Sequence, residues 1–538
     1  MKALLILNFI IFPNLLFFAQ KEKITASVWN ADNGNGTYTN PILHSDYSDP
    51  DVVKAGDAYY MTASSFNCIP GLPILKSYDL VNWELTNYAL KKNIPEELYN
   101  KVQPGKGVWA ACIRFHDDYF YIFYPDPDFG IYMIKTKNPE GDWSQPVLMK
   151  PGKGLIDPSP LWDDNGKAYL AYAFAGSRAG IKSILMICTM NQEGTLANQD
   201  DVLLIDGHQE ESTIEGPKIY KKNGFYYVFA PAGGVSTGWQ TVLRSKNIFG
   251  PYEKRKVMDQ GKTNINGPHQ GAWVFTDSGE DWFIHFQDKG AFGRIVLLEP
   301  MKWKDNWPII GNDFDNDGIG EPVSIFKKPN VGKTYAKISP PDSEEFNLPK
   351  LGLQWQWNAN SQIVWGFPSS LGYFTLNCIP KPTDFKNLFD APNAFLQKIP
   401  APNFTATAKI DTYFKDETEE AGLVILGLDY SYLKIKKKGD QLIISQVICE
   451  NADKHMTEKQ IESVSLNSKT VYLRVKLTAD GQSNFYVSEN NLNFKKIGSG
   501  FHMKEGKWIG AKIGFVALRD SFTNDAGYVK LDWLRFDN

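Results

Sequence analysis

The stretch Asn223-Gly-Phe-Tyr-Tyr-Val-Phe decides the fold, because it joins a tight turn to a strand of aromatic and β-branched residues. The pattern recurs in segments that begin at Gly56, Asp117, Asp164 and Asp277. A turn followed by β-formers, with another short strand upstream, predicts a β-hairpin. Hairpins at intervals of roughly 50 to 60 residues are typical of a propeller, whose blades are four-stranded sheets. We therefore predict an all-β fold that begins with a five-bladed β-propeller.

One position upstream of each hairpin turn varies in a way that indicates chemistry. Eight residues before one turn residue of each repeat stand, in chain order, Asp49, Trp109, Asp157, Glu215 and His269. The start of the innermost strand faces the propeller axis, so these side chains should converge on one pocket. Gathered carboxylates repel one another, and a purely structural repeat would keep one residue type. Turn capping by acidic residues is the alternative interpretation.

The second half of the chain shows a different pattern. Strands with alternating apolar residues, such as Phe404-Thr-Ala-Thr-Ala-Lys-Ile and Val529-Lys-Leu-Asp-Trp-Leu-Arg-Phe, occur with few helical patterns. This alternation predicts a β-sandwich. The predicted domains are a propeller over 30–326, a linker rich in Lys and Pro over 327–343, and a sandwich over 344–538.

The N-terminus resembles an export signal. Lys2 precedes an apolar run over 3–19, which ends before a polar stretch. A membrane span is the competing interpretation, but a span needs about 20 clean apolar residues, and Pro13 and Asn14 interrupt this shorter run. We therefore predict that residues 1–19 are a signal peptide, and that the mature protein is secreted or periplasmic and has no membrane contact after cleavage.

Composition excludes some classes of partner. The formal net charge of −4 argues against nucleic acid, whose binders usually carry a basic patch. Aromatic residues make up 14% of the chain; most should fill β-rich cores, although such rings also stack on sugars. The five Cys form no CxxC pair, which gives no support for a thiolate metal site. The sequence does not predict the oligomeric state.

Three carboxylates in one pocket suit acid–base chemistry such as glycoside hydrolysis. That reaction needs an acid for the leaving oxygen and a base or nucleophile on the opposite face. Glu215, with the longer side chain, is the predicted acid, and Asp49, held ahead of Pro50, is the predicted base. Asp157 should tune and orient the acid, because neighbouring charges push pKa values apart. Arg294 is the predicted cation that keeps an aspartate ionised; a surface arginine is the alternative.

Four short motifs carry a family resemblance. They resemble the active-site blocks of glycoside hydrolase family 43. The motifs are Ser48-Asp-Pro-Asp, Trp109-Ala-Ala-Cys-Ile-Arg-Phe-His, Ile156-Asp-Pro-Ser-Pro and Ile214-Glu-Gly-Pro. The stretch from Leu351 onward is similar to the β-sandwich appended in that family, a concanavalin-like jelly roll, so the resemblance covers nearly the whole mature chain. The sequence departs from the family at Ala111-Cys112, where a Pro-Asp or Pro-Glu pair is common, and this affects only the neighbourhood of Trp109.

The resemblance implies a propeller enzyme that acts with inversion. It implies Asp49 as general base, Asp157 as modulator of the pKa and Glu215 as general acid. The added sandwich is similar to the branch of β-xylosidases and α-L-arabinofuranosidases. That branch implies release of terminal β-D-xylose or α-L-arabinofuranose from xylan- or arabinan-type plant polysaccharides or their oligosaccharides. The sequence does not choose between the two sugars, or between chain ends and side branches.

Further residues are predicted to bind the substrate. Besides His269 and Arg294, the candidates are Phe66, Trp109, Phe129, Trp239 and Trp508, the last lent by the sandwich by analogy with the family. Core packing is the alternative for each aromatic ring.

A metal is predicted only as a candidate, and no cofactor is expected to be required. His269 corresponds to a family histidine near the propeller axis that touches a bound calcium ion in some members, so it is the candidate metal ligand. A histidine hydrogen-bonded beneath the pocket is the alternative. Asp313, Asp315 and Asp317 resemble the start of an EF-hand loop, but Ser324 stands where a glutamate is needed, and we predict a solvated turn.

Other function classes were weighed against the hydrolase. A non-catalytic carbohydrate-binding propeller, the main alternative, would keep the aromatic rings and lose the three carboxylates. An inverting phosphorylase needs a phosphate cradle of Arg, Lys and His, and only Arg294 lies near the pocket motifs. A structural or adhesion role explains export but not the residues in phase with the repeat. The sequence therefore favours a glycosidase whose partner is an oligo- or polysaccharide.

Overall fold

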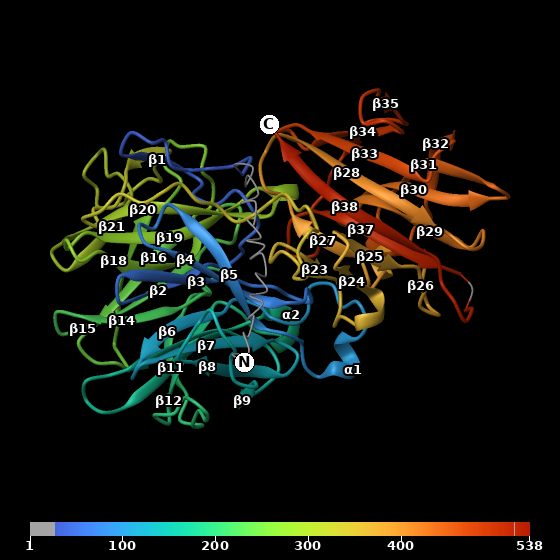
Figure 1. Ribbon diagram of the computed structural model, residues 1–538. Coiled ribbons are helices and arrows are strands. Elements are labelled where there is room, and N and C mark those ends of the chain that lie inside the picture. The colour runs from blue at the N-terminus through green and yellow to red at the C-terminus, as the bar shows by residue number, and fades with distance from the viewer. Residues whose placement is uncertain (1–26, 521) are drawn as a thin grey trace, which may run out of the picture.

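Each aromatic repeat forms the second strand of a four-stranded antiparallel sheet. The computed structural model describes residues 27–520 and 522–538, so the predicted signal peptide over 1–19 lies outside the described residues. Five such sheets follow one another along the chain and form a propeller, which lies beside a two-sheet sandwich (Figure 1). The predicted fold class is confirmed.

The blades follow in chain order. Blade 1 contains β2 (Asp51–Ala55), β3 (Ala58–Thr62), β4 (Gly71–Ser77) and β5 (Trp83–Leu90). Blade 2 contains β6 (Cys112–His116), β7 (Tyr119–Asp126), β8 (Gly130–Thr136) and β9 (Val147–Pro151). Blade 3 contains β10 (Leu155–Trp162), β11 (Ala168–Phe174), β12 (Ile184–Met190) and β13 (Val202–Asp206). Blade 4 contains β14 (Lys218–Lys222), β15 (Phe225–Ala232), β16 (Trp239–Ser245) and β17 (Glu253–Met258). Blade 5 contains β18 (His269–Phe275), β19 (Asp281–Asp288), β20 (Arg294–Lys304) and β21 (Trp307–Ile310).

The first strand of each blade is the innermost one. Neighbouring first strands contact one another around the axis, as β2 does with β6 and with β18. All five innermost strands therefore start at one end of the axis and end at the other.

Two pairings close the propeller into a ring. The short strand β1 (Thr37–Thr39) pairs antiparallel with β22 (Ile325–Lys327), which joins the two ends of the domain. Leu43 also forms a bridge with Val296 of the last blade. Because each blade is built from one contiguous segment, these pairings join the two ends of the domain, in addition to the contacts between β18 and β2. β22 crosses the predicted boundary between propeller and linker.

The sandwich consists of two eight-stranded sheets. The first contains β23 (Gln356–Trp357), β26 (Ile379–Pro380), β27 (Phe395–Lys398), β29 (Glu419–Leu426), β30 (Tyr430–Lys438), β31 (Gln441–Cys449), β32 (Lys459–Leu466) and β37 (Lys512–Arg519). The second contains β24 (Gly366–Ser369), β25 (Tyr373–Asn377), β28 (Phe404–Tyr413), β33 (Thr470–Leu477), β34 (Gln482–Ser488), β35 (Lys495–Lys496), β36 (Phe501–His502) and β38 (Tyr528–Asp537). Alternate side chains of both sheets fill the core between them, where Trp355 stacks on Phe395 at 4.3 Å between ring centroids.

Helices are few and short in the described part of the chain. They are α1 (Glu96–Tyr99), α2 (Gly176–Ala179), and the 3-10 turns η1 (Gly290–Phe292), η2 (Ile363–Trp365), η3 (Leu388–Asp390) and η4 (Ala452–Lys454). Within the described residues, none is long and apolar enough to cross a membrane. The five cysteines are all buried and free.

The sandwich is fixed to the propeller by hydrogen bonds between buried groups. Asp46 accepts from the backbone N–H of Gly510 at 2.9 Å and from that of Arg294, also at 2.9 Å. One buried carboxylate thus ties the sandwich loop 505–510 to the start of β20. Trp357 and Ile69 add a backbone bridge between the two domains. These contacts place a loop of the sandwich beside the propeller axis.

Candidate active site

The three predicted carboxylates meet in one pocket at the start of the innermost strands. Asp49 precedes β2, Asp157 lies in β10, and Glu215 precedes β14. All three line a cavity of about 120 Å³, together with Phe66, Trp109, Gln270, Arg294 and Trp508 among others. The repeat therefore brings together acids that are more than 50 residues apart in the sequence.

The backbone corrects how the repeats align. Asp49 and Asp157 both have a φ of 56°, and in blades 4 and 5 the positive φ falls on Gly216 (59°) and Gln270 (38°). The residue equivalent to the two aspartates in those blades is therefore one position later than Glu215 and His269. Counting back eight residues misses this shift because the counts start at turn residues that are not equivalent. Asp57 is the second residue of a two-residue turn, whereas Asn223 is the first residue of a turn of the same length. Asn165 is the third residue of a five-residue turn, whereas Asp277 is the second.

Asp49 is surrounded by hydrogen-bond donors. Arg294 Nη1 lies 3.0 Å from its Oδ1 and 3.3 Å from its Oδ2. The hydroxyls of Ser48 and Ser64 donate to Oδ2 at 2.9 and 2.5 Å. The carboxylate is buried, so the paired cation and the hydrogen bonds offset the cost of removing its charge from water.

A hydrogen bond connects Asp157 to the backbone beside Glu215. Its Oδ2 accepts the backbone N–H of Gly216 at 2.7 Å, and Gly216 directly follows Glu215. Burial raises the pKa of Asp157 to about 6, although the hydrogen bond from Gly216 acts in the opposite direction. The negative charge of Asp49 raises the pKa further. This contact places a titrating carboxylate next to the backbone of Glu215.

Glu215 is the protonated member of the group. Burial raises its pKa to about 8, and the negative charge of Asp157 adds to the effect. Its side chain is still 31% exposed, and that exposure opens into the pocket. A carboxylic acid that keeps its proton at pH 7 and reaches a cavity can donate that proton to a leaving oxygen.

His269 lies beneath the acid. Its Nε2 is 3.5 Å from Glu215 Oε1, and the imidazole is buried, which lowers its pKa to about 3. The ring is therefore neutral at pH 7. Neither ring nitrogen meets the geometry of a hydrogen bond to another group of the described protein.

The residues around His269 do not fit calcium. A hard cation of this kind prefers six to eight oxygen ligands, whereas the carboxylate in contact with the imidazole is that of Glu215, the acid itself. His269 also belongs to no group of three or more potential metal ligands within the described residues.

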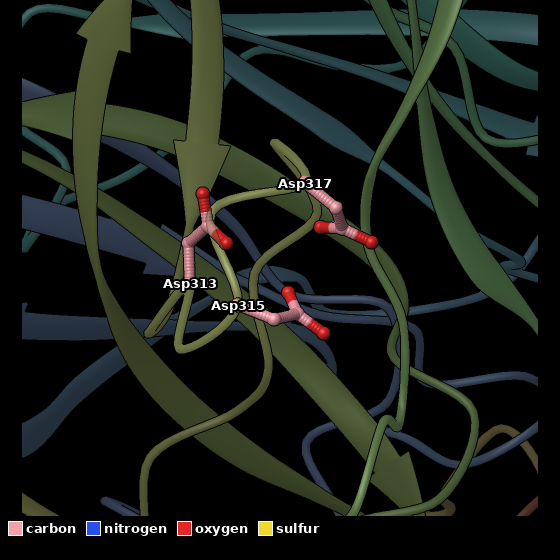
Figure 2. Close-up of side chains that lie close together, drawn as sticks. All are labelled: Asp313, Asp315 and Asp317. Carbon is pink, nitrogen blue, oxygen red and sulfur yellow. The ribbon is translucent and has the colours of Figure 1, made fainter.

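The one such group in the described residues lies elsewhere. Asp313, Asp315 and Asp317 lie on one loop after β21, with carboxylate oxygens within 4.8 Å of one another (Figure 2). Asp315 and Asp317 are exposed, and backbone N–H groups of Gly318 and Ile319 donate to Asp313 and Asp317. These hydrogen bonds are those of a tight turn at the surface.

Three of the predicted aromatic residues line the pocket. Trp109 lies between the other two, with ring centroids 6.2 Å from both Phe66 and Trp508. Trp508 comes from the sandwich and has a φ of 64°, a strained value for a bulky residue that costs about 1–3 kcal/mol. The loop that Asp46 anchors holds it there, at the mouth of the pocket.

The structure does not bring Phe129 and Trp239 into the pocket lining. Phe129 packs against the core between blades 1 and 2. Trp239 packs in blade 4, where its Nε1 donates to Glu211 at 3.0 Å. Both rings are half-buried against these cores, as in the core-packing alternative.

The sequence interpretation missed some residues of the site. Gln270 lines the pocket and occupies the position in blade 5 that Asp49 holds in blade 1. A repeat aligned one residue later would have found it. Ser64 gave no signal, because it comes from the far end of β3 and reaches Asp49 only through the folded hairpin.

Comparison with known proteins matches this geometry. The family model "Glycosyl hydrolases family 43" matches residues 38–308, and the model "Beta xylosidase C-terminal Concanavalin A-like domain" matches residues 343–537. The chain belongs to glycoside hydrolase family 43. It is therefore a glycosidase, and enzymes of this family generally need no cofactor.

Relatives of this family 43 enzyme have related names. A β-xylosidase of Formosa agariphila is 32% identical over 570 residues, covering 96% of this chain and 92% of the relative. A non-reducing end α-L-arabinofuranosidase of Bacteroides ovatus is 28% identical over 447 residues, covering 78% and 80%. The crystal structure of a xylan β-1,4-xylosidase from Bacillus halodurans shares the fold, with a TM-score of 0.82, 22% identity, and coverage of 93% of this chain and all of the other.

Proposed function

We propose that this family 43 glycosidase is an exported, inverting exo-enzyme that releases terminal pentose from xylan- or arabinan-type polysaccharides or their oligosaccharides. The observation that carries the proposal is the contrast between two carboxyl groups in one small pocket. Arg294 pairs with Asp49 at 3.0 Å, whereas burial and the charge of Asp157 raise the pKa of Glu215.

The proposed reaction moves two protons. Glu215 gives its proton to the glycosidic oxygen as the bond to the anomeric carbon breaks. A water molecule attacks the opposite face of that carbon, and Asp49 takes the proton of the water. Asp157 positions Glu215 through the Gly216 N–H and supplies the charge that helps keep it protonated before the reaction.

Inversion rests on the resemblance to the family, and the way Asp49 is held fits the role of the base. Its Oδ2 accepts from Ser48 and Ser64, and Arg294 contacts both oxygens. These donors fix the orientation of the carboxylate, from which it can orient and deprotonate a water molecule.

Action on terminal units is supported by the shape of the site. The cavity around the carboxylates measures about 120 Å³, which suits one sugar unit rather than a chain. A second cavity of about 330 Å³ adjoins it and shares Arg294 and Trp508 as lining residues. We infer that the terminal pentose occupies the first cavity and that the rest of the substrate extends through the second.

The names of the relatives make β-D-xylose the first sugar to test, with α-L-arabinofuranose as the second. For location, the support is Lys2 followed by the apolar run over 3–19, from which we propose a secreted or periplasmic enzyme without membrane contact after cleavage.

The test is hydrolysis of paired chromogenic β-D-xyloside and α-L-arabinofuranoside, with Asp49→Ala and Glu215→Ala beside the wild type. We expect activity on at least one sugar and its loss in both variants. Proton NMR of the first product should show the anomer opposite to that of the substrate. Product of the same anomeric form would contradict inversion, and an inactive wild type on both sugars and their oligosaccharides would contradict the pentose assignment.

A further inference from the structure

A third cavity, the far cavity, lies at the opposite end of the propeller axis. It measures about 310 Å³ and is lined by three consecutive residues from the innermost strand of every blade: 52–54, 114–116, 160–162, 219–221 and 273–275. The catalytic carboxylates stand at the start of these strands, and this cavity lies at their finish. Five residues separate Asp49 from Lys54, or roughly 16 Å of strand. Its volume falls within the range of small-molecule sites, about 300–1,000 Å³.

A buried polar layer separates the two cavities. Arg114 Nη1 pairs with Asp51 Oδ2 at 2.7 Å, and the fully buried Lys218 Nζ donates to the carbonyl of Ala111 at 3.2 Å. The far cavity and the catalytic pocket share no lining residue in the described chain. The far cavity is therefore not an extension of the active site.

Phenylalanine, tryptophan and tyrosine rings form part of the wall of the far cavity. Phe115 and Phe275 are 40% and 52% exposed, unusually high values for phenylalanine on innermost strands. Trp162, Tyr220 and Trp273 are half-buried beside them. The indoles are oriented by hydrogen bonds from Nε1, to the carbonyl of Gln192 for Trp162 and to Asp281 for Trp273. Fixed, partly exposed rings offer apolar faces at little cost in side-chain entropy.

The charges of the cavity are already balanced. Lys54 pairs with Asp277 at 2.7 Å, and Lys221 pairs with Asp163 at 2.5 Å and with Asp164 at 2.6 Å. Together with the Arg114–Asp51 pair, every lysine and arginine of the lining has a carboxylate partner. An anionic ligand would find no excess of positive charge here. Paired charges beside aromatic faces suit a neutral ligand with many hydroxyls.

We propose that this cavity is a second, non-catalytic binding site for a neutral polysaccharide chain. Aromatic rings would stack on sugar faces, and the paired side chains would hydrogen-bond to hydroxyls. The site would hold the polymer while the pocket at the other end of the axis acts on a chain end. The choice of xylan as the ligand rests on the proposed function, but the geometry of the far cavity does not.

The test is affinity electrophoresis of the full chain in native gels containing soluble neutral xylan, with arabinan and polygalacturonate gels in parallel. Chain ends are rare in a long polymer, so retardation reports binding along the chain. The double variant Phe115→Ala/Phe275→Ala should lose about tenfold in affinity, the order expected for two stacking contacts. Phe367→Ala in the sandwich, where the ring is 43% exposed, is the matched control and should migrate like the wild type.

Hydrolysis of the small chromogenic substrate separates the two proposals. It should be unchanged in the double variant, which also shows that the variant is folded. Retardation of the double variant equal to that of the wild type would overturn the inference, as would a wild type retarded by neither xylan nor arabinan, or only by polygalacturonate. If the wild type binds xylan through these rings but hydrolyses neither pentoside, the second site stands and the proposed function fails.

Discussion

Replacing Asp157 by asparagine should lower the pH at which activity is lost on the alkaline side. Burial is the first cause of the raised pKa of Glu215, and the charge of Asp157 is the second. Asparagine removes the charge, while its carbonyl oxygen can still accept the N–H of Gly216. The variant should therefore change the field at Glu215 and leave its position unchanged.

The size of the effect follows from Coulomb's law. Asp157 binds the backbone next to Glu215, so we take a separation of about 6 Å, the outer range at which neighbouring charges act. At an effective dielectric constant of about 20, two unit charges then interact by about 2.8 kcal/mol, which corresponds to about two pH units. Because the Glu215 side chain is 31% exposed, water screens part of this, and we expect about one pH unit. In a plot of kcat/KM against pH, the alkaline limb, where activity falls as Glu215 loses its proton, should move from about pH 8 to about pH 7.

The assay is kcat/KM for a chromogenic pentoside from about pH 5 to pH 10, because this ratio reports ionisations of the free enzyme. Asp277→Asn is the control, since that side chain is 79% exposed and pairs with Lys54 at the other end of the axis. Its alkaline limb should stay at about 8. A folded Asp157→Asn enzyme whose limb also stays at about 8 would refute the field argument, and burial alone would then account for the acid.

Three further predictions concern the acid, the pocket mouth and the sandwich core. Glu215→Gln should reduce kcat by about 10²–10⁴-fold, less with an activated leaving group than with xylobiose; an equal loss on both substrates would argue against its role as acid. Trp508→Ala should raise KM for oligosaccharides, whereas the free energy of unfolding should change by less than about 0.5 kcal/mol because the ring is exposed. An unchanged KM would show that Trp508 does not contact the substrate. Trp355→Ala should cost about 3–5 kcal/mol of unfolding free energy in denaturant titration, because its buried ring stacks on Phe395 at 4.3 Å; a loss below about 1 kcal/mol would show that the core refills the space.

Local pattern was enough to predict the blades and the three acids. A turn followed by an aromatic strand is a signal carried by neighbouring residues, and repeating it five times specifies a ring. Asp49, Asp157 and Glu215 could be found because the repeat carries their positions. The alignment was still one residue off in blades 4 and 5, because equivalent turn residues can be chosen only once the strand pairing that bounds each turn is known.

The aromatic candidates show that such patterns do not predict which rings line the pocket. Phe66 and Trp109 line the pocket, whereas Phe129 and Trp239, chosen on the same grounds, pack into cores. Whether a ring lines a cavity depends on what covers it, and the covering strands come from elsewhere in the chain.

By itself, the sequence determined the two β domains, the ring of blades and the acids that face its axis, because these follow from short-range turn and strand preferences repeated in phase. Only the tertiary structure decided the surroundings of those acids, since these depend on burial and on the approach of Arg294 and of the Gly216 N–H. It also decided that Trp508, which lies 293 residues after Glu215, stands at the mouth of the same pocket. Such long-range contacts depend on how the two domains dock, which local preferences do not specify.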